Sequence, residues 1–162
     1  MENTVYLADC ALGRGVFAAR HFALGERILE FTGPVISLAE AIAKGDAEAN
    51  PLQFEEELYL DLLPPAVFLN HSCAPNTGVA EGHWLVALRE IAPDEELRFD
   101  YSTTMHEDRW TMACRCGAAN CRSLVADFRL LPHERQQHYL RLGIVQPFIV
   151  RSLNGARSRS PP

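Results

Sequence analysis

The sequence has no apolar run approaching the roughly 20 residues of a membrane-spanning helix. Its start, Met1 to Arg14, lacks the basic and then apolar layout of a secretory signal. The low hydrophobicity and high charge of disordered chains are also missing, because apolar residues make up 48% and charged residues 22% of the chain. We therefore expect a soluble protein of a reducing compartment, the cytoplasm or the nucleus, with no membrane association.

An excess of positive charge is absent as well. The formal net charge is -6, which argues against binding to a phosphate backbone, so no direct nucleic-acid binding is expected. Long-range attraction between opposite charges would suit a basic protein or peptide partner. The length of 162 residues fits one domain with a single core.

Cysteine is scarce and unevenly placed. Three of the five cysteines fall within eight residues, and the set is Cys10, Cys73, Cys114, Cys116 and Cys121. In a chain without an export signal, such close spacing favours a metal site over disulfides. Cys10 has no spacing partner, so we expect it to be a small buried apolar residue.

Short apolar runs broken by glycine and proline predict a mainly β protein with short helices, of the α+β class. Strands are expected near residues 5–34 and over Glu55–Leu63, Trp84–Leu88 and Glu96–Tyr101. Ser37 and Glu40 form a capping-box pattern, which predicts a helix from Leu38 to about Glu48. A second helix is expected over Pro132–Leu142, ended by Gly143.

Two further segments have charged or polar composition. Residues Glu55 to Glu57, followed by Asp61, could receive a basic peptide, although an exposed charged strand end explains them equally well. The tail from Asn154 to Pro162 has no apolar periodicity and is predicted to be disordered.

Four motifs occur in a fixed order: Gly13-Arg14-Gly15, NHSCAPN at residues 70–76, ELRFDY at 96–101 and CRCGAANC at 114–121. Alone, the first could be an ordinary β-turn and the second a hydrogen-bonded turn. Together they resemble the SET-domain family, with its GxG, NHSCxPN core, terminal DY and post-SET CxCxxxxC.

This resemblance implies a β-fold with pseudoknot-like threading, in which the NHSC strand and the DY segment meet, and a C-terminal helix. It divides the chain into a SET domain (1–112), a post-SET zinc-binding segment (113–124), a C-terminal helical extension (125–153) and the tail (154–162). The connection before the NH core is shorter here than the family commonly has. The resemblance therefore implies that the wall of the site on the substrate side has fewer residues.

The CxCxxxxC motif offers three thiolates, whereas a structural zinc site needs four ligands. Cys73 is the candidate for the fourth ligand because it lies in the NHSC motif, and the resemblance implies that it joins Cys114, Cys116 and Cys121. Buried free cysteines and a redox pair are the alternatives. His133 and His138 are expected on a surface helix face rather than in a second metal site.

The resemblance also implies that the chain binds S-adenosylmethionine. The cofactor contacts would come from Gly13, Arg14, Gly15 and Val16, from the Asn70 side chain and the His71 backbone, and from Tyr101. Arg14 stands where the family often has an aromatic residue, which puts the adenine-side contact in doubt. Trp110 could face the cofactor or could pack under the zinc loop.

By the same resemblance, Tyr101 is the catalytic tyrosine, and Tyr59 and Phe99 line the lysine channel. Tyr59 could instead be an ordinary strand-face residue, and Phe99 could be plain core. The implied activity is protein-lysine N-methylation, with histone-like basic tails as the expected substrate. The alternative is an inactive, zinc-stabilised binding or scaffold module. Nothing in the sequence indicates an oligomeric state.

Overall fold

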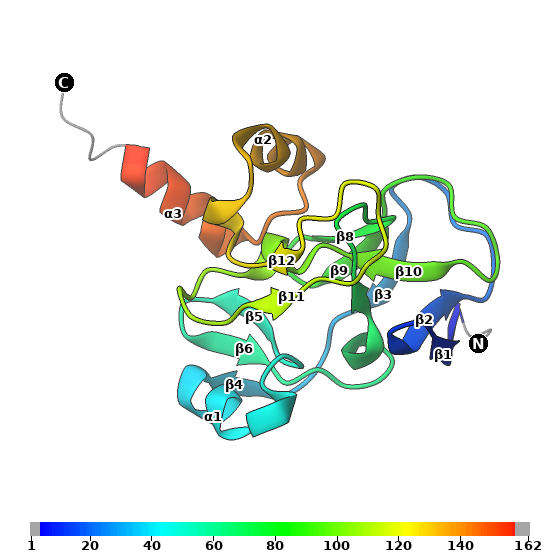
Figure 1. Cartoon of the computed structure of the whole chain (residues 1–162), viewed down its shortest axis with the longest axis horizontal. Helices are drawn as coiled ribbons and strands as arrows, with labels where there is room; N and C mark the ends of the chain where they lie inside the picture. Colours follow the sequence, from blue (N-terminus) through cyan, green and yellow to red (C-terminus); the bar gives the residue numbers. More distant parts are fainter. Residues whose placement is uncertain (1–3, 158–162) are drawn as a thin grey trace.

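The computed structural model describes residues 4–157, and it is built mostly of short strands (Figure 1). The first half contains β1 (Val5–Cys10), β2 (Gly13–Ala18), β3 (Arg27–Glu30), β4 (Val35–Ser37), α1 (Leu38–Ala43), η1 (Gly45–Ala47), β5 (Leu52–Glu55), β6 (Leu58–Leu60), η2 (Ala66–Phe68) and β7 (Asn70–His71). The second half contains β8 (Thr77–Ala80), β9 (Trp84–Ala87), β10 (Glu96–Phe99), η3 (Tyr101–Thr104), β11 (Met112–Ala113), β12 (Leu124–Val125), η4 (Phe128–Leu130), α2 (His133–Leu142) and α3 (Pro147–Arg157). The expected mainly β class is confirmed.

These strands form four small sheets. One sheet has the order β1-β2-β10-β7, and the others are β3-β9-β8, β4-β6-β5 and the pair β11-β12. In Figure 1, α1 lies at the end of the molecule away from α2, and β10 runs between the two ends. The central apolar cluster joins residues of several sheets, among them Val16, Phe31, Leu85 and Leu97.

Strand β7 pairs in parallel with β10, although 24 residues lie between them in the sequence. Arg98 is opposite Asn70, Phe99 is opposite His71, and the backbone N–H of Ser72 donates to the carbonyl of Phe99 at 3.1 Å. The NHSC and DY segments therefore meet, as the resemblance implied.

Helix α1 begins where the capping box predicts. The backbone N–H of Glu40 donates to the Ser37 hydroxyl oxygen, and the Glu40 carboxylate accepts from the backbone N–H of Ser37. This reciprocal pair satisfies two amides at the helix start. The α-helix ends at Ala43, earlier than expected, and the chain continues as the short helix η1.

The prediction of one strand over Glu55–Leu63 is wrong. The chain forms a hairpin instead, in which β5 pairs with β6 across a turn at Glu56 and Glu57. Glu57 has a φ of 56°, a conformation in which glycine is the usual residue. Because a glutamate occupies this position, the sequence does not indicate the turn. The strand expected over Glu96–Tyr101 also ends early, at Phe99, and Tyr101 begins η3.

The C-terminal extension packs on the β-rich part. Gly143 ends α2 with a φ of 68°, as predicted. Helix α3 extends to Arg157, so the prediction of disorder is wrong for residues 154–157, and residues 158–162 lie outside the described part of the chain. A Cβ added to Gly78 on β8 would lie 2.6 Å from Cγ2 of Ile144, so this glycine permits the close packing of the extension.

No helix within residues 4–157 is long and apolar enough to cross a membrane.

Candidate active site

Asn70, the first residue of β7, is tied to the GxG strand. Its Nδ2 lies 3.1 Å from the Arg14 carbonyl oxygen and 2.9 Å from Glu96 Oε1. The Arg14 side chain is exposed and its guanidinium lies over the ring of Phe68, 5.4 Å from the centroid. The structure therefore brings the GxG motif and the NHSC motif together.

Gly15 is buried beneath these groups. A Cβ at this position would lie 2.7 Å from Glu96 Oε1 and 3.3 Å from Asn70 Nδ2. Its missing side chain thus makes room for Glu96 and Asn70, whereas the neighbouring Gly13 and Arg14 remain exposed. Burial raises the pKa of Glu96, but hydrogen bonds from Arg98 and Asn70 lower it by a larger amount, so the pKa lies below its ordinary value.

His71, the second residue of β7, connects the NHSC motif to the DY motif. Burial lowers its pKa to about 4, so the imidazole is neutral at physiological pH. Its Nδ1 accepts a hydrogen bond from the backbone N–H of Tyr101 at 3.1 Å, so the ring proton belongs on Nε2. Nε2 lies 3.3 Å from Cys73 Sγ, where this proton can be donated to a thiolate.

The four cysteines proposed as zinc ligands lie together. The Sγ atoms of Cys73, Cys114, Cys116 and Cys121 are all within 4.8 Å of one another, and Cys73 and Cys114 are 3.7 Å apart. Sulfur atoms on a tetrahedral zinc with bonds of about 2.3 Å lie about 3.8 Å apart. The side chains therefore fit a structural zinc ion.

Backbone amides surround these sulfur atoms as they would surround thiolates. The N–H of Arg122 donates to Cys73 Sγ at 3.4 Å, that of Cys73 to Cys116 Sγ at 3.5 Å, and that of Ser123 to Cys121 Sγ at 3.4 Å. Such outer hydrogen bonds orient metal ligands and stabilise their charge. A four-thiolate site leaves no position for a reactive water, so its role would be structural.

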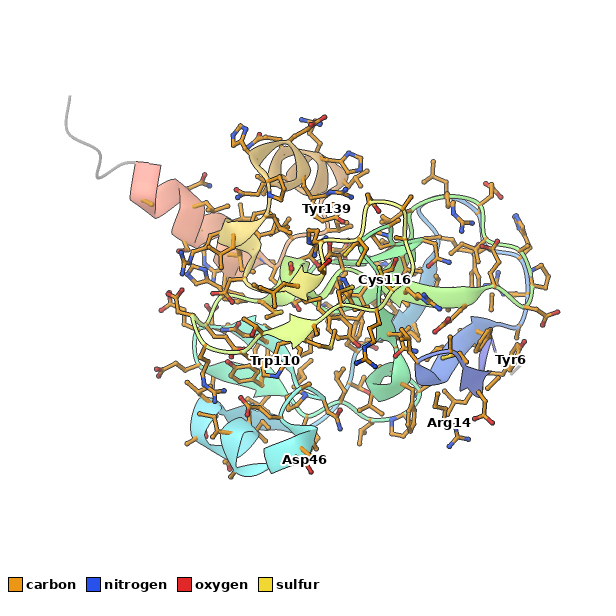
Figure 2. The ribbon with its side chains drawn as sticks, in the orientation of Figure 1. Tyr6, Arg14, Asp46, Trp110, Cys116 and Tyr139 are labelled. Atoms are coloured by element: carbon orange, nitrogen blue, oxygen red, sulfur yellow. The ribbon has the colours of Figure 1, made fainter. Side chains whose placement is uncertain are left out.

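A pocket with a cavity volume of about 160 Å³ opens beside the DY segment, and cavities of about 150 Å³ admit a benzene-sized ligand. Residues from separate parts of the chain line it, including Tyr59, Leu62, Leu69, Phe99, Tyr101 and Trp110. The three predicted channel residues are therefore in one pocket. In Figure 2, Trp110 lies towards β5 and β6, far from Arg14 at the other end of the molecule.

Aromatic contacts hold the pocket wall. The rings of Phe99 and Tyr101 are 4.9 Å apart, and those of Phe99 and Phe31 are 5.9 Å apart in an edge-to-face arrangement. The Tyr101 hydroxyl donates to the Leu69 carbonyl oxygen at 2.6 Å, so its lone pairs remain available as acceptors. Burial raises the pKa of Tyr101, which keeps it a neutral phenol.

The family model described as "SET domain" matches residues 13–102, which include the GxG strand, the NHSC segment and the DY segment. The chain belongs to the SET-domain family.

Named relatives of this SET domain are much longer proteins. The chain is 32% identical over 139 residues to Histone-lysine N-methyltransferase 2D of Homo sapiens, covering 75% of this chain and 2% of that protein. It is 30% identical over 129 residues to Histone-lysine N-methyltransferase, H3 lysine-4 specific, of Saccharomyces cerevisiae, covering 68% of this chain and 12% of that protein.

Among solved structures, KRYPTONITE in complex with mCHH DNA, H3(1-15) peptide and SAH matches with a TM-score of 0.59 and 26% identity. The match covers 75% of this chain and 29% of that one. A second KRYPTONITE complex, with mCHG DNA and SAH, has a TM-score of 0.60, 25% identity and coverage of 78% and 30%.

The structure also places the other residues noted in the sequence. Cys10 is half-buried, with its sulfur 3.4 Å from Asn70 Nδ2, so the expectation that it is a buried residue is wrong. His133 and His138 are exposed on α2, and the four-cysteine group is the one metal-ligand cluster found within residues 4–157. Two of the four carboxylates expected to receive a basic peptide already have ion-pair partners, since Glu55 pairs with Arg151 and Asp61 with Lys44.

Sequence reasoning missed a buried polar network on Asp100, the residue before Tyr101. Asp100 is 1% exposed and accepts two hydrogen bonds from the Arg122 guanidinium, at 2.7 and 2.8 Å. The Tyr139 hydroxyl, on α2, donates to the same carboxylate at 2.9 Å. The 113–124 segment and α2 are thus both bonded to the DY motif, and Figure 2 labels Tyr139 on the side of α2 that faces the sheets.

We expect Tyr139→Phe to lower the free energy of unfolding by about 1.5–3 kcal/mol, the range for a hydrogen bond to a charged group. The substitution removes only the hydroxyl and keeps the buried ring, so the fold should remain. Urea denaturation of the variant and the wild type measures the difference. A variant as stable as the wild type would show that Arg122 and the backbone N–H of Ser102 satisfy Asp100 without Tyr139.

Proposed function

We propose that this SET domain is an S-adenosylmethionine-dependent protein-lysine N-methyltransferase that acts on histone-like basic tails. The observation that carries the proposal is the pocket shared by Tyr101, Tyr59 and Phe99. It lies next to the DY segment, which pairs with the strand of Asn70 and His71. The likeness to proteins named as histone-lysine methyltransferases, and to one solved with an H3(1-15) peptide and SAH, supports the same conclusion.

The exposed surface at Gly13 and Arg14, together with Asn70, would hold the cofactor. Within residues 4–157 the Asn70 side-chain oxygen has no hydrogen-bond partner, so it is free to accept from an amino group of a ligand. The backbone of His71 follows Asn70 on β7, and the Tyr101 hydroxyl donates to the carbonyl oxygen of Leu69, the residue before Asn70. When bound, the cofactor supplies a methyl group on a positively charged sulfur.

Tyr101 would orient the target amine rather than take its proton. A lysine has an ordinary pKa of about 10.4 and must be neutral to act as a nucleophile. Burial of the amine in an apolar pocket lowers that pKa, because the charged form loses its hydration. The Tyr101 oxygen, with its proton committed to Leu69, presents only lone pairs to the amine.

Trp110 would act on the substrate side, since it lines the pocket with Tyr59 and Met112. Its ring would then pack along the aliphatic part of the lysine side chain. The cysteine cluster would bind one structural zinc ion and keep the 113–124 segment against Arg98, whose guanidinium donates to the Cys116 carbonyl oxygen at 3.2 Å.

Transfer of a labelled methyl group tests the function. The full chain is incubated with labelled S-adenosylmethionine and either core histones or an H3(1–15) peptide, and the products are mapped by mass spectrometry. Label on a lysine is the expected result. If calorimetry detects cofactor binding but no methyl group is transferred to any histone or to a cell extract, the inactive scaffold is favoured instead.

The number of methyl groups added should depend on Phe99. The wild type is expected to reach di- or trimethyl-lysine, and Phe99→Tyr should shift the product towards monomethyl-lysine, because the new hydroxyl occupies space beside the amine. Intact-mass measurement of the peptide over a full time course reads the ratio. Phe31→Tyr is the matched control, since Phe31 packs against Phe99 outside the pocket lining. A wild-type reaction that stops at one methyl group in excess cofactor would contradict this prediction.

A further inference from the structure

Glu107 is a carboxylate inside the candidate lysine pocket. It lies between η3 and β11 and lines the pocket together with Tyr59 and Tyr101. Its Oε2 accepts a hydrogen bond from the Tyr59 hydroxyl, and its backbone N–H donates to Asp127 Oδ2 at 3.1 Å. The side chain is half-buried.

Glu107 forms no ion pair within the described part of the chain, although the cation of Arg109 lines the same pocket. Glu48, the other glutamate of the pocket lining, is paired with Arg109, whereas Glu107 has no Lys or Arg partner within residues 4–157. On the side of η4 it faces Asp127, and on β6 it faces Tyr59.

The residues on either side of Glu107 do not supply a partner cation for its carboxylate. Asp108 is paired with Arg129, and the buried Nδ1 of His106 has no hydrogen-bond partner among residues 4–157. Burial, opposed by the hydrogen bond from Tyr59 and aided by the charge of Asp127, raises the pKa of Glu107. The folded chain therefore holds a carboxylate whose charge is poorly compensated, and a cationic ligand would relieve this.

The hydrogen bond to Tyr59 also fixes the direction of that hydroxyl. The proton of Tyr59 is committed to Glu107, so the lone pairs of its oxygen remain available, as do those of Tyr101. Two phenol oxygens and one carboxylate in the same pocket suit an ammonium group, which has three donors and no acceptor.

We propose that Glu107, acting with Tyr59, binds the ε-ammonium of the target lysine as it enters the pocket. This inference rests on the proposed lysine methyltransferase function. A carboxylate stabilises the charged form of the lysine, which must still lose its proton before transfer, so its contribution falls on substrate binding and does not speed the methyl-transfer step. Loss of the charge should therefore raise KM for the peptide and should not lower kcat.

Glu107→Gln is the test variant, because glutamine keeps the size and an oxygen that can accept from Tyr59. With the H3(1–15) peptide and saturating cofactor, we expect KM to rise about tenfold, equivalent to about 1.4 kcal/mol, with kcat unchanged or higher. Glu81→Gln is the matched control. It removes the same charge from an exposed carboxylate that pairs with Arg27 and lies outside the pocket lining, so KM should change by less than about twofold.

A second measurement does not depend on which protein is the substrate. n-Butylammonium chloride and neutral 1-butanol are titrated into the wild type and Glu107→Gln, and the indole N–H of Trp110 is followed by NMR. Trp84 on β9 is outside the pocket lining and serves as the internal reference. The wild type should prefer the ammonium over the alcohol by about tenfold, and the variant should lose that preference.

The possible outcomes distinguish the role of Glu107 from the proposed lysine methyltransferase function. An unchanged KM in Glu107→Gln, or an equal preference for butylammonium in both proteins, overturns the role of Glu107 even if the wild type methylates the peptide. A wild type that transfers no methyl group, but whose preference for butylammonium depends on Glu107, overturns the proposed enzyme and supports the cation site.

Discussion

Cys114→Ser should release the zinc ion, which is expected at about one per chain in the wild type. The serine hydroxyl is a poor replacement for a thiolate, and the three remaining sulfur atoms cannot complete a tetrahedral site. Structural zinc contributes on the order of 10 kcal/mol to the folding of small zinc domains, so the 113–124 segment should lose its fixed structure. Elemental analysis under reducing conditions measures the zinc content, and thermal denaturation measures the fall in Tm.

The effect should reach the active site because the zinc segment is attached to it. Arg122 holds Asp100, next to Tyr101, and Arg98 holds the carbonyl of Cys116. Cofactor binding, measured by calorimetry, should therefore weaken in Cys114→Ser. Cys10→Ser is the control, since Cys10 lies outside the cluster and should leave the zinc content unchanged. Zinc-free wild-type protein, purified under reducing conditions, would refute the assignment.

Local sequence rules predicted those elements whose signals are themselves local. The Ser37 and Glu40 pair predicted the start of α1, and Gly143 predicted the end of α2, because each residue acts on the backbone beside it. Residues 125–153 were expected to be a helical extension, but α3 was not predicted as a separate helix, because its start is rich in apolar and β-branched residues, namely Phe148, Ile149 and Val150. Its helical form depends on burial, since Phe148 and Ile149 pack in the cluster with Phe128 and Tyr139.

The site residues predicted from the sequence are those that carry a family motif. Asn70, Tyr101 and the four cysteines were predicted in this way, and the structure places the strand of Asn70 beside β10, Tyr101 against His71, and the four cysteines together. Arg122, Tyr139 and Glu107 carry no such signal. Each matters through a contact with a residue 22 to 48 positions away, and no spacing rule predicts such a contact. Only the folded chain brings them together.

Tyr101→Phe should reduce the rate of methyl transfer by about 100-fold, the lower end of the effect of removing one preorganised polar group from an active site. The substitution removes the single oxygen that Tyr101 presents in the pocket. Its ring contacts, with Phe99 at 4.9 Å and His71 at 5.4 Å, do not involve the hydroxyl and should be kept. The free energy of unfolding should fall by only about 1 kcal/mol, because a single hydrogen bond, to the Leu69 carbonyl oxygen, is lost.

Single-turnover transfer to the H3(1–15) peptide measures the rate, and calorimetry should find cofactor binding nearly unchanged. Tyr6→Phe is the matched control, because it also loses one hydrogen-bonded hydroxyl, donated to Asp94 at 2.8 Å, on the exposed face of β1. Its transfer rate should equal that of the wild type.

The pH dependence of the rate gives a second test of the role of Tyr101. Burial raises the pKa of Tyr101 above its ordinary value of about 10, so the phenol remains protonated between about pH 7 and pH 9. A lysine substrate loses its proton progressively over the same range, so the wild-type rate should rise with pH because the neutral amine becomes more abundant. If Tyr101 only orients that amine, Tyr101→Phe should be slower at every pH and should rise with the same slope. A rise that disappears in the variant would mean that Tyr101 itself takes the proton, which contradicts the orienting role.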